Sequence, residues 1–242
     1  MKDDRIDILG CTSAQFVDYA ARSGVHRHNA LGLYQQFFRE QCLDLDVPDI
    51  QTPDVQVAYS VREGETVKFI QTDGAGREIE SVIIPGVSKS GRRRATLCVS
   101  SQIGCAMGCE FCETAQMGLI ANLSAAQIVV QWFAARFELG YTIDNIVFMG
   151  MGEPLDNIHA VLQAIRVLTD HHGPSIAPSR ITVSTVGRTR GITTIAELRR
   201  AGTLGPVRLA VSINAPNDSI RGRIMPSNRA EPMDALMEAM NQ

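Results

Sequence analysis

The hydrophobic positions near the N-terminus follow a helical period. Thr12 and Gln15 form a capping-box pattern ahead of an apolar run, which predicts the start of a first helix. A second run places Phe37 and Phe38 on one helical face. We therefore expect a small helical domain over residues 1–48.

The period then changes to that of β-strands. Residues 54–85 alternate between apolar and polar side chains, and Asp73–Gly76 has the composition of a hairpin turn. The sequence predicts a β-hairpin extension over residues 49–94, in which 86–94 form a flexible basic loop.

From residue 95 onwards short apolar strands alternate with helices, which predicts an α/β domain with a parallel sheet or barrel over 95–242. Only four β/α units are present, too few to close an eight-stranded barrel. The expected strands lie near Thr96–Ser100, Asn145–Met149, Ile181–Thr185 and Arg208–Ile213, and the expected helices at 125–139, after Asn157, after Thr194 and from Pro232.

The composition is that of a globular protein, with 45% hydrophobic residues among 242. No apolar run approaches the length of a membrane span, and the first ten residues lack the apolar centre of a signal peptide. These features favour a cytoplasmic protein with no membrane partner.

The net charge of −3 conceals an uneven distribution. Residues 180–229 contain nine arginines and two acids, a local net charge of +7, and Lys89 with Arg92–Arg94 adds a second basic stretch. Such asymmetry indicates a polyanionic partner such as RNA. Arginines that sit singly on solvated helix faces would give the same count, and charge alone does not choose between the two.

Three of the six cysteines fall within eight residues, at Cys105, Cys109 and Cys112. Thiolates with this C-x3-C-x2-C spacing can bind a single 4Fe-4S cluster, and three ligands for four irons leave one iron open to a substrate. The alternatives are a zinc site, for which no nearby histidine supplies a fourth ligand, and plain reduced thiols. Cys11 and Cys42 are expected to be ordinary buried thiols.

With an aromatic residue before its last cysteine, this motif resembles that of the radical S-adenosylmethionine (SAM) superfamily. The surrounding residues, from about Glu80 to the end of the chain, resemble the RlmN/Cfr family of RNA adenine methyltransferases. The resemblance implies a partial (β/α)6 radical SAM barrel that binds a 4Fe-4S cluster and SAM. The matching segments are Cys98–Cys105, Thr114–Gly118, Phe148–Pro154, Val183–Thr185, Ser212–Asp218 and Met225–Pro226.

The resemblance also implies which residues bind SAM. Gly152 and Glu153 match the site of the SAM amino group, although Gly-Glu-Pro could equally be a plain strand-to-helix turn. Ser184, Ser212, Ile213 and Asn214 match the positions that bind the ribose and methionine parts of SAM. Local backbone capping would also explain the two serines. The family more often has Ser-Leu-His in place of Ser212–Asn214, and an asparagine cannot titrate near neutral pH.

In the family, one SAM methylates a cysteine near the C-terminus and a second SAM supplies the radical that activates this methyl group. Cys98 matches the second cysteine of that scheme, which resolves the protein–RNA link as a disulfide. Glu80 matches the proposed proton acceptor. Without the resemblance, Cys98 would be a buried strand thiol and Glu80 a surface carboxylate.

No cysteine follows Cys112, so no residue of this sequence matches the methyl-carrying cysteine. We therefore expect that these 242 residues alone do not complete methyl transfer, and that the incomplete barrel leaves an exposed edge and has poor stability.

The function implied is methylation of C2 of an adenine in 23S rRNA, with tRNA as a further substrate. The alternatives are a radical SAM enzyme that acts on adenine C8 or on a peptide or small molecule, and a non-catalytic RNA-binding fragment. The expected partners are RNA and an electron donor such as flavodoxin or ferredoxin, and the chain is expected to be a monomer.

Overall fold

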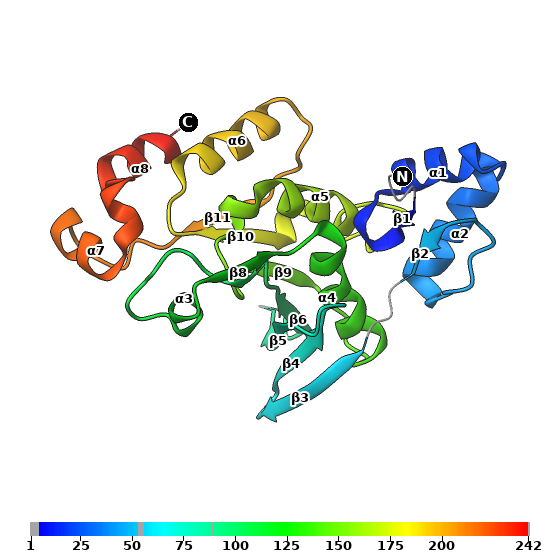
Figure 1. Cartoon of the computed structure of the whole chain (residues 1–242), viewed down its shortest axis with the longest axis horizontal. Coiled ribbons are helices and arrows are strands. Elements are labelled where there is room, and N and C mark those ends of the chain that lie inside the picture. The colour runs from blue at the N-terminus through cyan, green and yellow to red at the C-terminus, as the bar shows by residue number, and fades with distance from the viewer. Residues whose placement is uncertain (1–4, 53–55, 89, 242) are drawn as a thin grey trace.

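A seven-stranded mixed sheet organises the chain in the computed structural model, which describes residues 5–52, 56–88 and 90–241 (Figure 1). The strand order is β11-β10-β9-β6-β5-β4-β3. Four strands are parallel, namely β6 (Arg93–Cys98), β9 (Asn145–Phe148), β10 (Ile181–Thr185) and β11 (Arg208–Val211). Three strands extend the sheet in antiparallel pairing, namely β3 (Val57–Glu63), β4 (Thr66–Thr72) and β5 (Glu78–Val87).

Helices connect the parallel strands and cover one face of the sheet. Their buried side chains form one core with strand residues such as Leu97, Ile146 and Val183. The predicted α/β fold with four β/α units is confirmed, because α4 (Ala125–Phe137), α5 (Ile158–Leu168) and α6 (Thr189–Arg200) join successive parallel strands, and α8 (Met233–Met240) follows the fourth.

The N-terminal helices pack against α4, at the end of the molecule opposite α7 (Asp218–Ile224) (Figure 1). They are α1 (Ser13–Arg22), which begins with the predicted capping box, and α2 (Arg27–Glu40). Phe37 of α2 stacks on Phe133 of α4 with ring centroids 5.1 Å apart. A two-stranded parallel pair, β1 (Ile6–Asp7) and β2 (Ile50–Gln51), brackets these helices.

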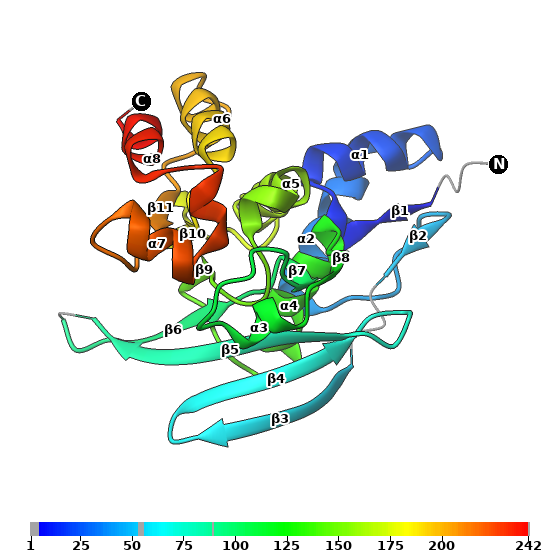
Figure 2. The ribbon, with the colours of Figure 1, turned by 60° about the vertical axis from the view of Figure 1, so that its left-hand side comes forward.

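The hairpin strands are part of the main sheet. β5 pairs with β6 as far as Val87 and Arg93, so both strands continue into residues 86–94, which the sequence predicted to be a loop. In Figure 2 the long strands β3, β4 and β5 extend the sheet beyond the helices. The domain boundaries at 48 and 94 stay a prediction, and the β5–β6 pairing crosses the second of them.

One predicted helix start is wrong. The sequence predicted a helix after Thr194, whereas α6 begins at Thr189. The Glu231 carboxylate accepts hydrogen bonds from the Thr189 backbone at 2.8 Å and its hydroxyl at 3.1 Å. A residue distant in the sequence therefore satisfies the free N–H of the first turn, which local pattern cannot reveal. Two short helices, α3 (Glu113–Gln116) and α7, were not predicted.

No helix among the described residues combines the length and the apolar character needed to cross a bilayer. The remaining elements are the hairpin of β7 (Gln102–Gly104) and β8 (Leu119–Asn122) and four 3-10 helices, η1 (Ile8–Gly10), η2 (Pro154–Asn157), η3 (Pro178–Arg180) and η4 (Pro226–Arg229).

The Phe37–Phe133 stack is expected to join the N-terminal helices to the sheet domain. Changing Phe133, which is 1% exposed, to alanine should lower the free energy of unfolding by about 3–5 kcal/mol. The measurement is urea unfolding followed by circular dichroism. Val61→Ala, at a side chain 53% exposed, is the control and should change stability by less than about 0.5 kcal/mol. Equal losses in the two variants would contradict the assignment.

Candidate functional site

The loop that carries the three cysteines is fixed at both ends by backbone hydrogen bonds. Cys105 N–H donates to the Gly118 carbonyl at 2.9 Å, and Glu110 N–H donates to the Ile224 carbonyl of α7, also at 2.9 Å. Gly104 has a φ of +71°, and a Cβ there would lie 1.9 Å from the Gly118 oxygen. Only glycine fits this crossing of the two chain segments.

The three thiols are free and enclosed. Cys105 and Cys109 are buried and Cys112 is half-buried. Burial raises the pKa of both Cys105 and Cys109 above the ordinary value, and each feels the charge of neighbouring cysteines. No three His, Cys, Asp or Glu side chains in the described part of the chain are arranged around a single metal ion. Three neighbouring cysteines with C-x3-C-x2-C spacing, all lining one cavity, suit a cluster in which each thiolate binds its own iron.

These thiols open into a cavity of about 380 Å³ at the carboxyl ends of the parallel strands. A cavity at this edge is where parallel α/β folds place their ligands. All the predicted SAM contacts except Ile213 line it, together with the apolar residues Phe111, Met149 and Met225, which belong to the matching motif and segments but had no predicted role. The predicted members of the wall are Cys105, Cys109, Cys112, Gly152, Glu153, Ser184, Ser212 and Asn214.

A set of buried amide side chains positions the walls of the cavity. Gln102 accepts the Glu153 N–H at 2.8 Å, and Asn157 donates to the carbonyls of Ser101 and Leu123 at 2.8 and 2.7 Å. Gln131 of α4 is fully buried and bonds both the N–H and the carbonyl of Ser100. These roles could not be read from the sequence, because each depends on contacts between distant segments.

Gly150 and Gly152 allow the chain after β9 to approach its neighbours. A Cβ on Gly150 would lie 2.8 Å from the Val99 carbonyl oxygen, and one on Gly152 would lie 2.5 Å from Cβ of Gln102. The φ of Gly152 is +99°. Both positions therefore require glycine for close approach.

Glu153 is a buried carboxylate, 2% exposed, bound to neutral groups. Its oxygens accept the Leu155 N–H at 3.0 Å and the Val186 N–H at 2.8 Å. Burial raises the pKa of Glu153 above its usual range, and these hydrogen bonds partly oppose that shift. A cation that entered the cavity would favour the ionised form.

The loop after β11 contributes Ser212, Ile213 and Asn214. Asn214 has a φ of 54°, a left-handed conformation that asparagine tolerates better than most residues. Its Nδ2 lies 3.7 Å from Sδ of Met225. Ile213 does not line the cavity, and its carbonyl accepts a hydrogen bond from Arg221 at 3.1 Å.

Cys98 and Glu80 lie outside the cavity wall. Cys98 of β6 pairs with Val82 of β5, so these two side chains project from the same face of the sheet. Glu80 is two residues from Val82 on β5 and therefore projects from that face as well. The Glu80 carboxylate pairs with Lys68 at 3.0 Å. Burial raises the pKa of Cys98 to about 11, while a backbone hydrogen bond from Met149, which lines the cavity, acts in the opposite sense.

The arginines do not form one basic patch. Arg221 is buried, and Arg188 pairs with Asp156 at 2.7 Å and with Glu231 at 3.3 Å. Arg199, Arg200 and Arg208 lie at the opposite end of the parallel strands from the cavity, because α6 ends and β11 begins there. In the other basic stretch Arg92 pairs with Asp144 and Arg93 with Glu65, and Lys89 lies outside the described residues. The local count of +7 therefore overstates the free charge near the site.

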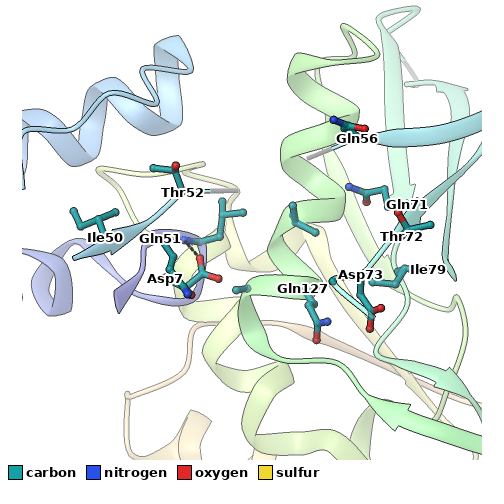
Figure 3. A pocket seen from close by; sticks show the side chains of 14 residues that line it. Asp7, Ile50, Gln51, Thr52, Gln56, Gln71, Thr72, Asp73, Ile79 and Gln127 are labelled. Carbon is teal, nitrogen blue, oxygen red and sulfur yellow. Dashed lines mark hydrogen bonds between the residues drawn. The ribbon is translucent and has the colours of Figure 1, made fainter. Parts of the chain in front are cut away.

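A second cavity of about 470 Å³ lies between β2, the β4–β5 turn and the start of α4 (Figure 3). Its wall is rich in amide and hydroxyl side chains, among them Gln51, Thr72 and Gln127. It contains none of the predicted site residues, so its greater volume does not make it the catalytic cavity.

Comparison with known proteins identifies the family. The profile of the Radical SAM superfamily matches residues 99–242. The probable dual-specificity RNA methyltransferase RlmN 1 of Protochlamydia amoebophila (strain UWE25) is 41% identical over 257 aligned residues, which cover 99% of this chain and 69% of that protein. The chain belongs to the RlmN/Cfr-like group of the radical SAM superfamily.

Other members agree with this placement. The probable dual-specificity RNA methyltransferase RlmN of Salinibacter ruber is 38% identical, with 98% of this chain and 69% of that protein aligned. The crystal structure of a radical SAM methyltransferase from Sphaerobacter thermophilus superposes with a TM-score of 0.85 at 33% identity, and covers 97% of this chain and 71% of that one. Membership of the radical SAM superfamily implies a 4Fe-4S cluster and SAM, which the thiols and cavity described above fit.

The close approach at Gly152 generates a first prediction for this radical SAM site. Gly152→Ala should weaken SAM binding to the reconstituted protein about tenfold or more, because the new Cβ displaces Gln102 and with it the Glu153 backbone. Equilibrium dialysis with radiolabelled SAM measures the effect. Gly202→Ala is the matched control, since Gly202 also has a positive φ (+70°) but has nothing within 4 Å of the added carbon. Equal affinities in the two variants would refute the prediction.

A second prediction concerns Cys98. Because its pKa is raised to about 11, the protonated thiol persists at neutral pH and the thiolate fraction grows about tenfold per pH unit below that value. Alkylation of Cys98 by iodoacetamide, followed by peptide mass spectrometry, should therefore be slow at pH 7 and accelerate up to about pH 11. A rate that levels off near pH 8.5 would show an unperturbed thiol. Cys42, which is half-buried, provides the internal comparison in the same samples.

Proposed function

We propose that the chain acts in the methylation of C2 of an adenine in 23S rRNA and in tRNA, with SAM as methyl donor and radical source. The observation that carries the proposal is the shared cavity of the three cluster cysteines, Glu153, Ser184 and Ser212 at one end of the parallel strands. The names of the curated relatives, dual-specificity RNA methyltransferases, support the choice of RNA as substrate.

Each group of cavity residues has a distinct proposed role. Cys105, Cys109 and Cys112 would bind the cluster, which when bound supplies one electron for the reductive cleavage of SAM. The buried Glu153 carboxylate would accept hydrogen bonds from the SAM ammonium group, a charge-assisted contact that burial strengthens. Ser184, Ser212 and Asn214 offer polar groups for the remainder of SAM, while Phe111 and Met225 supply apolar wall.

Cys98 and Glu80 are proposed as the resolving thiol and its proton acceptor. Both project from the face of the sheet shared with Val82, and Cys98 is bonded to Met149 of the cavity wall. With a pKa of about 11 the thiol needs a base at neutral pH, and the Glu80 carboxylate is close enough to influence that pKa. An external electron donor, a single-chain state and a cytoplasmic location remain predictions.

The first test is anaerobic iron–sulfur reconstitution, reduction with SAM present, and assay of 5′-deoxyadenosine. The wild-type chain should form this product, and Cys109→Ala should lose it, because one cluster ligand is missing. Cys42→Ala removes a half-buried cysteine elsewhere and should keep full product formation. Undiminished product from Cys109→Ala would overturn the proposed cluster site.

The same reactions with 23S rRNA and tRNA fragments address the substrate. Digestion of the RNA and mass spectrometry distinguish 2-methyladenosine from 8-methyladenosine. No cysteine follows Cys112, so we expect SAM cleavage without a methylated base from these 242 residues. Methylated adenine in this assay would contradict the need for a later methyl-carrying cysteine.

A further inference from the structure

Arg221 is the largest fully buried side chain of the described residues, with 1% of its surface exposed. It lies on α7, whose first turn is capped by the Asn217 side chain at 2.9 Å from the Ile220 N–H. An arginine keeps its charge when buried, so a fully enclosed guanidinium normally needs a carboxylate partner.

The partners of Arg221 are all neutral. Its Nε donates to the Ile213 carbonyl at 3.1 Å, and Nη1 donates to Oδ1 of Asn228 at 2.6 Å. Further acceptors are the carbonyls of Ser212 at 3.2 Å and Glu231 at 3.5 Å, and that of Val186. No carboxylate oxygen of the described residues lies within ion-pair distance of the guanidinium.

The nearby acids are occupied elsewhere. The Glu231 carboxylate binds Arg188 and the start of α6, so only its backbone carbonyl reaches Arg221. The Asp218 carboxylate accepts from Asn228 Nδ2 at 2.8 Å and from the Met233 N–H at 2.9 Å. Burial lowers the pKa of Arg221, and the charges of Asp218, of Cys109, a cluster ligand, and of Glu231 oppose this shift. The guanidinium therefore has no directly bonded carboxylate among the described residues, and these acids act on it only from a greater distance.

The guanidinium binds the loops that form the cavity. Ser212 and Val186 both line it, and the Val186 N–H also binds Glu153 at 2.8 Å. Met225, which follows α7, is fully buried among Cys105, Met107 and Cys109, and the Ile224 carbonyl accepts the Glu110 N–H of the cysteine loop. The Arg221 side chain is thus bonded to the SAM-binding loops, while the helix that carries it is bonded to the cluster loop.

We infer that Arg221, whose guanidinium has no direct carboxylate partner, supplies a fixed positive charge that acts on the cluster. A 4Fe-4S cluster with three thiolates is an anion, and reduction adds another negative charge, so a nearby cation stabilises the reduced form. Because the charge is buried, solvent screens it little. Arg221 therefore makes the cluster easier to reduce. This role rests on the cluster of the proposed function.

The test is the reduction midpoint of the cluster in the full chain, titrated anaerobically with and without SAM and followed by electron paramagnetic resonance. In Arg221→Met the ratio of reduced to oxidised cluster at a fixed applied potential should fall about tenfold, because one buried positive charge is lost. Arg221→Lys keeps the positive charge, so its midpoint potential should stay close to that of the wild type. Arg223→Met removes an exposed arginine from the same helix and should leave the midpoint unchanged.

A second design covers the case that Arg221→Met does not fold. The exchange Asp218→Asn with Asn228→Asp moves a carboxylate onto Nη1 of Arg221 and keeps the net charge of the chain, at the cost of the hydrogen bond from Asn228 Nδ2 to the Asp218 carbonyl. A carboxylate bonded directly to the guanidinium offsets its charge, so the midpoint should fall, though by less than in Arg221→Met, whereas a merely structural role predicts no change. An unchanged midpoint in the exchange variant, or in a folded Arg221→Met, overturns the inference. Failure of the wild-type chain to take up a cluster would instead count against the proposed function.

Discussion

The parallel pairing of β6, β9, β10 and β11 is the constraint on which the site depends. Parallel strands carry their carboxyl ends to the same edge of a sheet. The loops after these four strands therefore meet, although they are separated by more than a hundred residues. The cysteine loop, the Gly150–Glu153 turn, Val186 and Ser212 each leave one of the four strands and converge on one cavity.

Neutral amides and backbone groups then fix these loops in relation to one another. Gln131, Gln102 and Asn157 each bond main-chain groups of a different segment in the interior. Amide side chains both donate and accept, so they satisfy the polar ends of strands without introducing a charge. The glycines at 104, 150 and 152 allow the chain segments to lie closer than any side chain would permit. The walls are consequently set before a ligand arrives.

Against this neutral background two ionisable side chains are buried, Glu153 in the cavity wall and Arg221 against the loops that form it. Glu153 is negative and Arg221 positive, and each is bonded to backbone groups or an amide instead of an opposite charge. Burial opposes the ionised form of both, as the raised pKa of Glu153 and the lowered pKa of Arg221 show. A zwitterionic ligand beside an anionic cluster would compensate both charges. The buried charges of the protein are therefore opposite in sign to those of the proposed cofactors.

The sequence by itself determined the family, the α/β alternation and the cofactors, because the C-x3-C-x2-C spacing and its flanking motifs are local and specific. It also placed the four parallel strands to within a few residues, since their apolar runs are short and bounded by polar segments. Only the tertiary structure decided the start of α6, which Glu231 caps from forty-two residues away. The same holds for the arginines: a count of charges cannot tell exposed Arg223 from buried Arg221, because burial and pairing depend on which distant loops pack around each side chain.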